Sequence, residues 1–139
     1  MDYIVYGINT NEPNANGRIY HPDALVKAIE EYKEVVAQGR GVVELRDNND
    51  PKIEINYLDV CAKVEDINYD KDEGVVITSI STPISTPKGG IYKDLLDLEV
   101  PLTIGMSCVG RRSAGGMTFV EKIVGFSFIQ EQGDYSDEL

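Results

Sequence analysis

The hydrophobic period of this chain changes near Gly39, and this change limits the folds that the chain can adopt. Before it, apolar side chains recur at helical spacing after the start signal His21-Pro22, which predicts a helix over 22–38. After it, apolar and polar residues alternate over 58–65, which is typical of a half-buried strand. A long helix followed mainly by strands indicates a domain that contains both kinds of element.

Strands outnumber helices in the rest of the pattern, and most of them are neighbours in sequence. This order favours an α+β fold, with an antiparallel or mixed sheet covered by two helices. Because about six strands would leave exposed edges in a flat sheet, we expect a mostly antiparallel β-barrel or a strongly curved sheet. The other strands are predicted at 2–8, 42–45, 75–81, 104–109 and 117–129, and the second helix at 89–98.

Length and charge narrow the class of protein. The 139 residues suit one domain over 1–130, followed by an acidic tail over 131–139 that we expect to be frayed. The formal net charge is 13 − 24 = −11, which disfavours binding to nucleic acid and suits a basic protein partner. No transmembrane run or secretion signal is visible, so we expect no membrane association.

The spacing of cysteines, acidic residues and glycines predicts neither a metal site nor a bound cofactor. Cys61 and Cys108 are expected to be free thiols in a reducing cytosol. The acidic residues over 44–50 lack the central glycine of a calcium loop, which favours a solvated loop. Gly89-Gly90 lacks the Gly-Lys-Ser/Thr ending of a phosphate loop.

Ser107 is the candidate nucleophile, because it lies where an apolar strand runs into a glycine turn. A serine at such a place is more often a strand-end residue with local hydrogen bonds. Its hydroxyl would need a base, and the only histidine, His21, is expected to cap a helix. Arg111 and Arg112 follow the turn; they either hold an oxyanion or a partner carboxylate, or form surface ion pairs.

Five segments, in order along the chain, resemble the prohead (head maturation) proteases of tailed phages. The Asn-Ala-Asn-Gly-Arg-Ile-Tyr sequence before the first helix and the Thr-Pro-Lys-Gly sequence before the second are similar to two motifs of that family. The resemblance implies a herpesvirus-type (assemblin-like) serine protease barrel and a Ser–His pair that cleaves scaffold and capsid proteins in the immature head. The segments are 14–20, 41–45, 84–96, 100–110 and 125–129.

Carried over by position, the resemblance places Ser107 on the nucleophile of the family. Asp47 falls on the position of the family's histidine, which follows a Glu-Leu pair. If the loop carries an insertion, Asp50-Pro51 takes that position instead. Val109 stands where the family has an arginine after its serine pair.

The replacement of the histidine predicts a catalytically inactive relative, a pseudoenzyme. An aspartate has a reference pKa of about 3.9, against about 6.5 for histidine, so it is a far weaker base at neutral pH. Losing one member of a serine triad costs ~10⁴–10⁶ in turnover. We therefore predict that this chain does not catalyse proteolysis.

The resemblance then implies a structural protein of the virion, made in the cytoplasm of the bacterial host. It would be a capsid-associated, decoration or neck component, assembled as a homo-oligomer or with capsid, scaffold or neck proteins. Two alternatives stay open: an active maturation protease that uses Ser107 with an unrecognised base, and a small cytosolic binding domain unrelated to phages. Lysine could supply that base, and the chain offers Lys52, Lys88 and Lys122.

Overall fold

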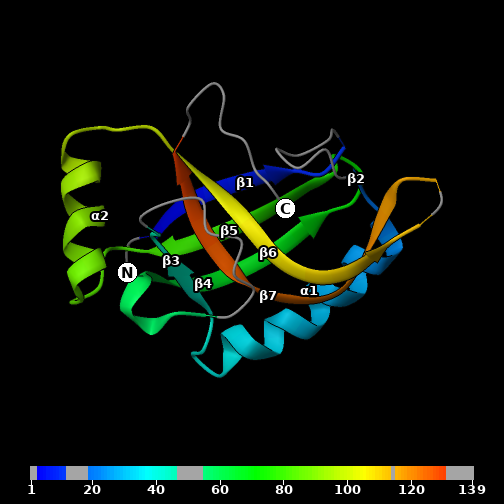
Figure 1. Cartoon of the computed structure of the whole chain (residues 1–139), viewed down its shortest axis with the longest axis horizontal. Coiled ribbons are helices and arrows are strands. Elements are labelled where there is room, and N and C mark those ends of the chain that lie inside the picture. The colour runs from blue at the N-terminus through cyan, green and yellow to red at the C-terminus, as the bar shows by residue number, and fades with distance from the viewer. Residues whose placement is uncertain (1–2, 12–18, 47–54, 114, 131–139) are drawn as a thin grey trace.

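A seven-stranded mixed sheet with two α-helices makes up the part of the chain that the structure describes (Figure 1). The computed structural model describes residues 3–11, 19–46, 55–113 and 115–130. The strands are β1 (Tyr3–Asn9), β2 (Ile19–Tyr20), β3 (Val42–Glu44), β4 (Val60–Asp70), β5 (Val75–Ser81), β6 (Leu102–Arg112) and β7 (Met117–Gln130). The helices are α1 (Pro22–Ala37), α2 (Pro87–Asp97) and the short 3₁₀ helix η1 (Tyr57–Asp59).

The sheet is antiparallel in one part and mixed in the other. β1, β5, β4 and β3 pair antiparallel in that order. β2 and β3 run parallel to β7 along one of its edges, while β6 runs antiparallel along the other edge. The sheet curls into a half-barrel in which β1 and β6 come into contact (Figure 1). The predicted α+β fold with a strongly curved sheet and two helices is therefore confirmed.

Local signals account for both ends of α1, which confirms the first predicted helix within one residue. His21 is the N-cap and Pro22 takes the first helical position, where its missing N–H costs nothing. At the other end Gly39 adopts a φ of 73° and donates to the carbonyl of Val36 at 2.9 Å. The buried face of α1 packs against β7 and β4, and it consists of Leu25, Ala28, Ile29 and Tyr32.

β4 departs from the predicted alternation at its start. The side chain of Asn56 accepts a hydrogen bond from the backbone N–H of Leu58 at 3.1 Å, which begins η1 and leaves Leu58 77% exposed. Cys61, expected on the polar face, is fully buried because α1 and α2 both pack against β4. The strand predicted over 58–65 therefore starts two residues later and is apolar on both faces there.

β6 and β7 form a longer hairpin than the alternation of apolar and polar residues predicted, since β6 was expected only over 104–109. Their ladder continues to the pair Arg112 and Thr118, so residues 110–112 of the turn expected over 110–116 belong to β6. Gly110 permits this extension, since a Cβ there would collide with the carbonyl oxygen of Phe119. Two register shifts in the ladder add to its curvature.

Aromatic side chains attach α2 to the sheet. Tyr92 of α2 is fully buried, and its hydroxyl lies 3.1 Å from that of Tyr6 on β1. Both rings contact Phe128 of β7, with centroid distances of 4.6 Å for Tyr92 and 5.3 Å for Tyr6. This cluster fills the half-barrel where its first and last strands approach each other.

Candidate functional site

Ser107 lies within β6 and pairs with Gly125 of β7. Its neighbours Met106 and Cys108 pack against the core, so the alternation of the strand turns Ser107 away from the core. The residue is half-buried, and no described residue forms a hydrogen bond with its hydroxyl. We call this side of the β6–β7–β3 ladder the outer face; it carries Gly105, Ser107, Gly125, Ser127 and Glu44.

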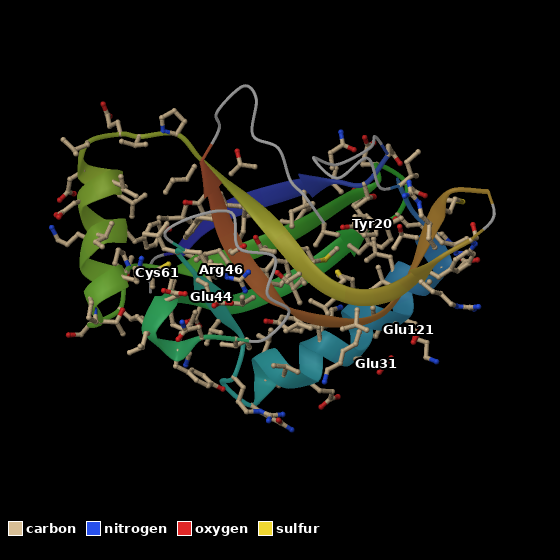
Figure 2. The ribbon with its side chains drawn as sticks, in the orientation of Figure 1. Tyr20, Glu31, Glu44, Arg46, Cys61 and Glu121 are labelled. Atoms are coloured by element: carbon tan, nitrogen blue, oxygen red, sulfur yellow. The ribbon has the colours of Figure 1, made fainter. Side chains whose placement is uncertain are left out.

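Glu44 brings a buried charge to the outer face. The ladder sets it opposite Ser127, and it is 2% exposed. Its carboxylate accepts hydrogen bonds from Arg46 Nη2 and from the backbone N–H of Asn56, each at 3.0 Å (Figure 2). These hydrogen bonds compensate the carboxylate for its lost hydration. They also link the end of β3 to Asn56, which begins η1.

This arrangement corrects the solvated acidic loop expected over 44–50, which is wrong at Glu44. Asp47 and Asp50 lie outside the described residues. The ion pair between Glu44 and Arg46 was also not predicted, although the sequence contains a signal for it. A glutamate and an arginine two positions apart share one face of a strand, and this pair stands at the end of an apolar segment.

Ile55 covers the outer face beside Ser107. A Cβ placed on Gly125 would lie 3.9 Å from the Ile55 side chain, and Gly125 itself is buried. An apolar side chain therefore packs against the strand partner of the candidate nucleophile. An alkyl group cannot take a proton from a hydroxyl.

His21 lies near the other end of the hairpin. Its Nδ1 accepts from the backbone N–H of Ala24 at 3.4 Å, and its ring stacks on Phe119 with a centroid distance of 4.4 Å. Phe119 pairs with Arg111, four positions along β6 from Ser107, or ~13 Å at the usual rise of a strand. The interpretation of His21 as a helix cap is confirmed, and the structure does not bring it together with Ser107.

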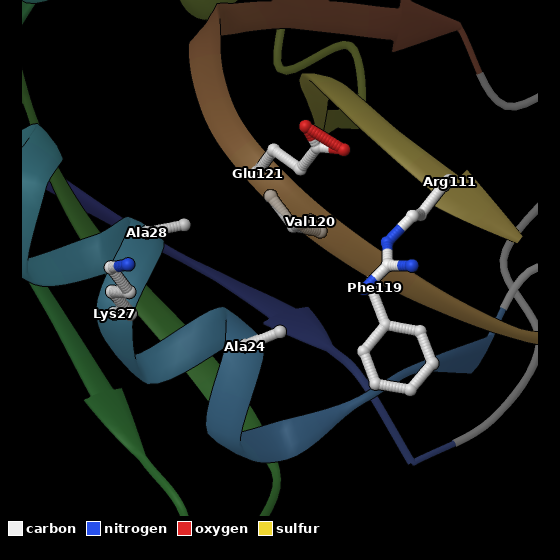
Figure 3. Close-up of a pocket in the computed structure, with 7 residues that line it drawn as sticks. All are labelled: Ala24, Lys27, Ala28, Arg111, Phe119, Val120 and Glu121. Carbon is white, nitrogen blue, oxygen red and sulfur yellow. The ribbon is translucent and has the colours of Figure 1, made fainter. Parts of the chain in front are cut away.

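Arg111, four positions along β6 from Ser107, lines a cleft between α1 and the β6–β7 hairpin (Figure 3). Its Cζ lies 5.6 Å from the ring centroid of Phe119. Arg112 pairs with Thr118 in the ladder and does not line this cleft. Neither arginine forms an ion pair with a residue that the structure describes.

The candidate lysines have different surroundings. Lys122 is exposed and pairs with Val109, two pairs along the ladder from Ser107 and on the same side of it. Lys88 Nζ lies 3.9 Å from Asp59 Oδ1. Lys52 lies outside the described residues.

Cys61 is buried, Cys108 is half-buried, and neither forms a disulfide bond. Over the described ranges, no group of three His, Cys, Asp or Glu side chains could hold a metal ion. None of the described helices is long and apolar enough to cross a membrane.

Comparisons with known proteins bear on the fold. No family model matches the chain, and no curated protein matches its sequence. Among solved structures, the chain is similar to the capsid assembly protease gp21 of bacteriophage T4, with a TM-score of 0.66 and 17% identity. The likeness covers 92% of this chain and 77% of that chain. The curled sheet and two helices of this chain thus form a prohead protease-like fold.

Proposed function

We propose that this chain is a non-proteolytic structural component of a phage head, built on the prohead protease fold. The observation that carries the proposal is the position of His21, which is engaged in capping α1 and stacking on Phe119. The nucleophile position, Ser107, lies on another part of the hairpin with no described hydrogen-bond partner for its hydroxyl. Without a base, a serine hydroxyl stays protonated and attacks a peptide carbonyl poorly.

The surroundings of Ser107 support a structural role. Ile55 packs against Gly125, and the nearest buried carboxylate of the outer face, Glu44, is satisfied by Arg46 and a backbone amide. Both carboxylate oxygens of Glu44 thus already accept hydrogen bonds within the protein. These contacts stabilise the sheet and provide no acid–base pair.

A head protein of this kind would be capsid-associated, a decoration protein or a neck component. The net charge of −11 suits a surface that meets basic regions of capsid, scaffold or neck proteins. It would act as part of an assembly in the particle, alongside further copies or other head proteins.

A fluorophosphonate probe tests the absence of a reactive serine. We expect the wild-type chain to label no faster than Ser107→Ala, while trypsin in the same reaction labels fully. Ser127→Ala is the matched control, because Ser127 lies on the same outer face. Labelling that disappears in Ser107→Ala and persists in Ser127→Ala would overturn the proposal.

Mass spectrometry of purified mature particles tests the structural role directly. We expect the intact chain at a fixed stoichiometry to the major capsid protein. A maturation protease is expected to leave the head or to be degraded there. Absence of the chain from mature particles would contradict the structural role.

The second candidate is an active maturation protease in which Lys122 replaces histidine as the base. Its support is the shared side of the ladder, where Lys122 lies two pairs beyond Ser107. In that case Lys122→Ala would abolish hydrolysis of a scaffold substrate as completely as Ser107→Ala. Lys93→Ala, an exposed lysine of α2, would have no effect.

A further inference from the structure

The cleft between α1 and the β6–β7 hairpin lies apart from Ser107 and combines charged, aromatic and small side chains (Figure 3). Its volume is about 370 Å³. Val120 lies at its floor, and its walls consist of Ala24, Lys27 and Ala28 on α1 and of Arg111, Phe119 and Glu121 on the hairpin. Sites for small ligands run from about 300 to 1,000 Å³, so this cleft has room for one or two side chains.

Arg111 is held in place with its donors unused. Its guanidinium lies over the ring of Phe119, which is itself stacked against His21. A guanidinium over an aromatic ring uses its face for that contact, and its N–H groups stay free in its plane. Such a group is prepared to bind a carboxylate with two parallel hydrogen bonds.

The two cations of the cleft have no ion-pair partner among the described residues. Lys27 and Arg111 stand alone, whereas Lys33, Lys71 and Lys93 elsewhere on the surface are paired with carboxylates. In a protein with 24 acidic and 13 basic residues, two cations against one carboxylate, Glu121, give the lining of this cleft a net charge of 2 − 1 = +1.

A strand edge next to the cleft is also uncovered by other strands. β2 pairs with β7 only up to Thr118, and β3 begins its pairing at Phe126. Between these points neither strand covers this edge of β7, and α1 lies beside it. Because α1 packs beside this edge, the cleft is the space that remains between the helix and the hairpin.

We propose that this cleft binds an acidic side chain on an extended segment of another head protein, with Arg111 binding the carboxylate and Lys27 on the opposite wall adding positive charge. The inference rests on the proposed structural role for the nature of the partner. Glu121 at the rim and the net charge of −11 disfavour a polyanion, so the segment carries one or two carboxylates. Glu121 is left to accept a hydrogen bond from a peptide N–H of the same segment.

Titration of the ¹⁵N-labelled full chain with capped pentapeptides tests this site. The probes are acetyl-Gly-Ala-Glu-Ala-Gly-amide, the same peptide with glutamine, and free glutarate. We expect the glutamate peptide to shift the amide signals of Lys27, Arg111 and Phe119, and the glutamine peptide to bind about tenfold more weakly or not at all.

Two variants locate the site. Arg111→Gln should weaken binding of the glutamate peptide about tenfold or more, since a charge-assisted bond is lost. Arg112→Gln is the matched control and should bind as the wild type does, because Arg112 does not line the cleft. Equal binding of the two peptides, or binding unaffected by Arg111→Gln, would overturn the proposal.

The glutarate arm separates a protein partner from a free acid. Glutarate as tight as the peptide would refute recognition of a peptide segment. These outcomes are independent of the reactivity of Ser107 and of the presence of the chain in particles, so each proposal can fail alone.

Discussion

The imidazole of His21 stacks on the phenyl ring of Phe119 with 4.4 Å between the ring centroids and 22° between the planes. This contact joins the start of α1 to the hairpin at a place well separated from the pair Ser107 and Gly125. A histidine held in this way contributes to stability through its cap and its ring. It is not in a position to act on the hydroxyl of Ser107.

We expect His21→Ala to lower the free energy of unfolding by about 1–2 kcal/mol, because it removes both the cap acceptor and the ring contact. His21→Asn restores an acceptor at the N-cap without the stacking and should recover about half of that loss. Urea denaturation followed by circular dichroism measures both. Two variants as stable as the wild type would contradict the roles given to the cap and the ring.

The ion pair between Glu44 and Arg46 predicts a large effect of a single substitution. Arg46→Met leaves the Glu44 carboxylate buried without its cation, which should cost about 3 kcal/mol of unfolding free energy. Lys93→Met is the control and should leave stability unchanged, since both groups of its pair with Asp97 are about two-thirds exposed, at 66% and 65%.

A double variant separates charge burial from side-chain packing at this pair. Glu44→Gln combined with Arg46→Met should be more stable than Arg46→Met alone, because no unpaired charge remains buried. If the double variant is less stable than the wild type by the sum of the losses measured for Glu44→Gln and Arg46→Met alone, the two groups do not act as a pair.

Two adjacent glycines at the start of α2 should respond in opposite directions. A Cβ on Gly89 would collide with the carbonyl oxygen of Ile84, so Gly89→Ala should cost about 1–3 kcal/mol of unfolding free energy. A Cβ on Gly90 meets no atom within 4 Å, so Gly90→Ala should stabilise the helix by about 0.5–1 kcal/mol. Thermal denaturation of both variants gives the comparison, and equal effects would refute this packing.

Stability should fall at high pH because buried groups hold their protons. Burial raises the pKa of the Cys61 thiol to about 12 from 9.0, and that of the Tyr32 hydroxyl to about 12 from 10.0. Between about pH 9 and pH 12 the unfolded chain has lost protons that the folded chain keeps, so the free energy of unfolding decreases as the pH rises. Below that window both states are protonated and this contribution is fully present.

Denaturant titrations at pH 8, 10 and 11 measure this slope. The double variant Cys61→Ala, Tyr32→Phe should show a shallower decline than the wild type. Burial also raises the pKa of Tyr92, so a residual slope is expected in that variant. A wild-type stability that is flat up to pH 11 would contradict the prediction.

At the candidate site, some features could be predicted from the sequence and others could not. The identity of the candidate nucleophile and the shortage of histidine follow from the residues themselves. The burial of Glu44 does not, because a charge at the end of a short strand is exposed unless a partner and a covering segment are supplied by the fold. Arg46 and Asn56 supply both here.

The sequence by itself determined the elements with strong local signals. The cap of His21, the stop at Gly39 and the helical spacing between them specify α1, and alternation specifies most of the hairpin of β4 and β5. Only the tertiary structure decided that β2 and β3 share one edge of β7, and that His21 lies by Phe119 instead of Ser107. The physical reason is range: caps and periods act over a few residues, whereas parallel pairing joins residues far apart in sequence and depends on how the whole sheet curls.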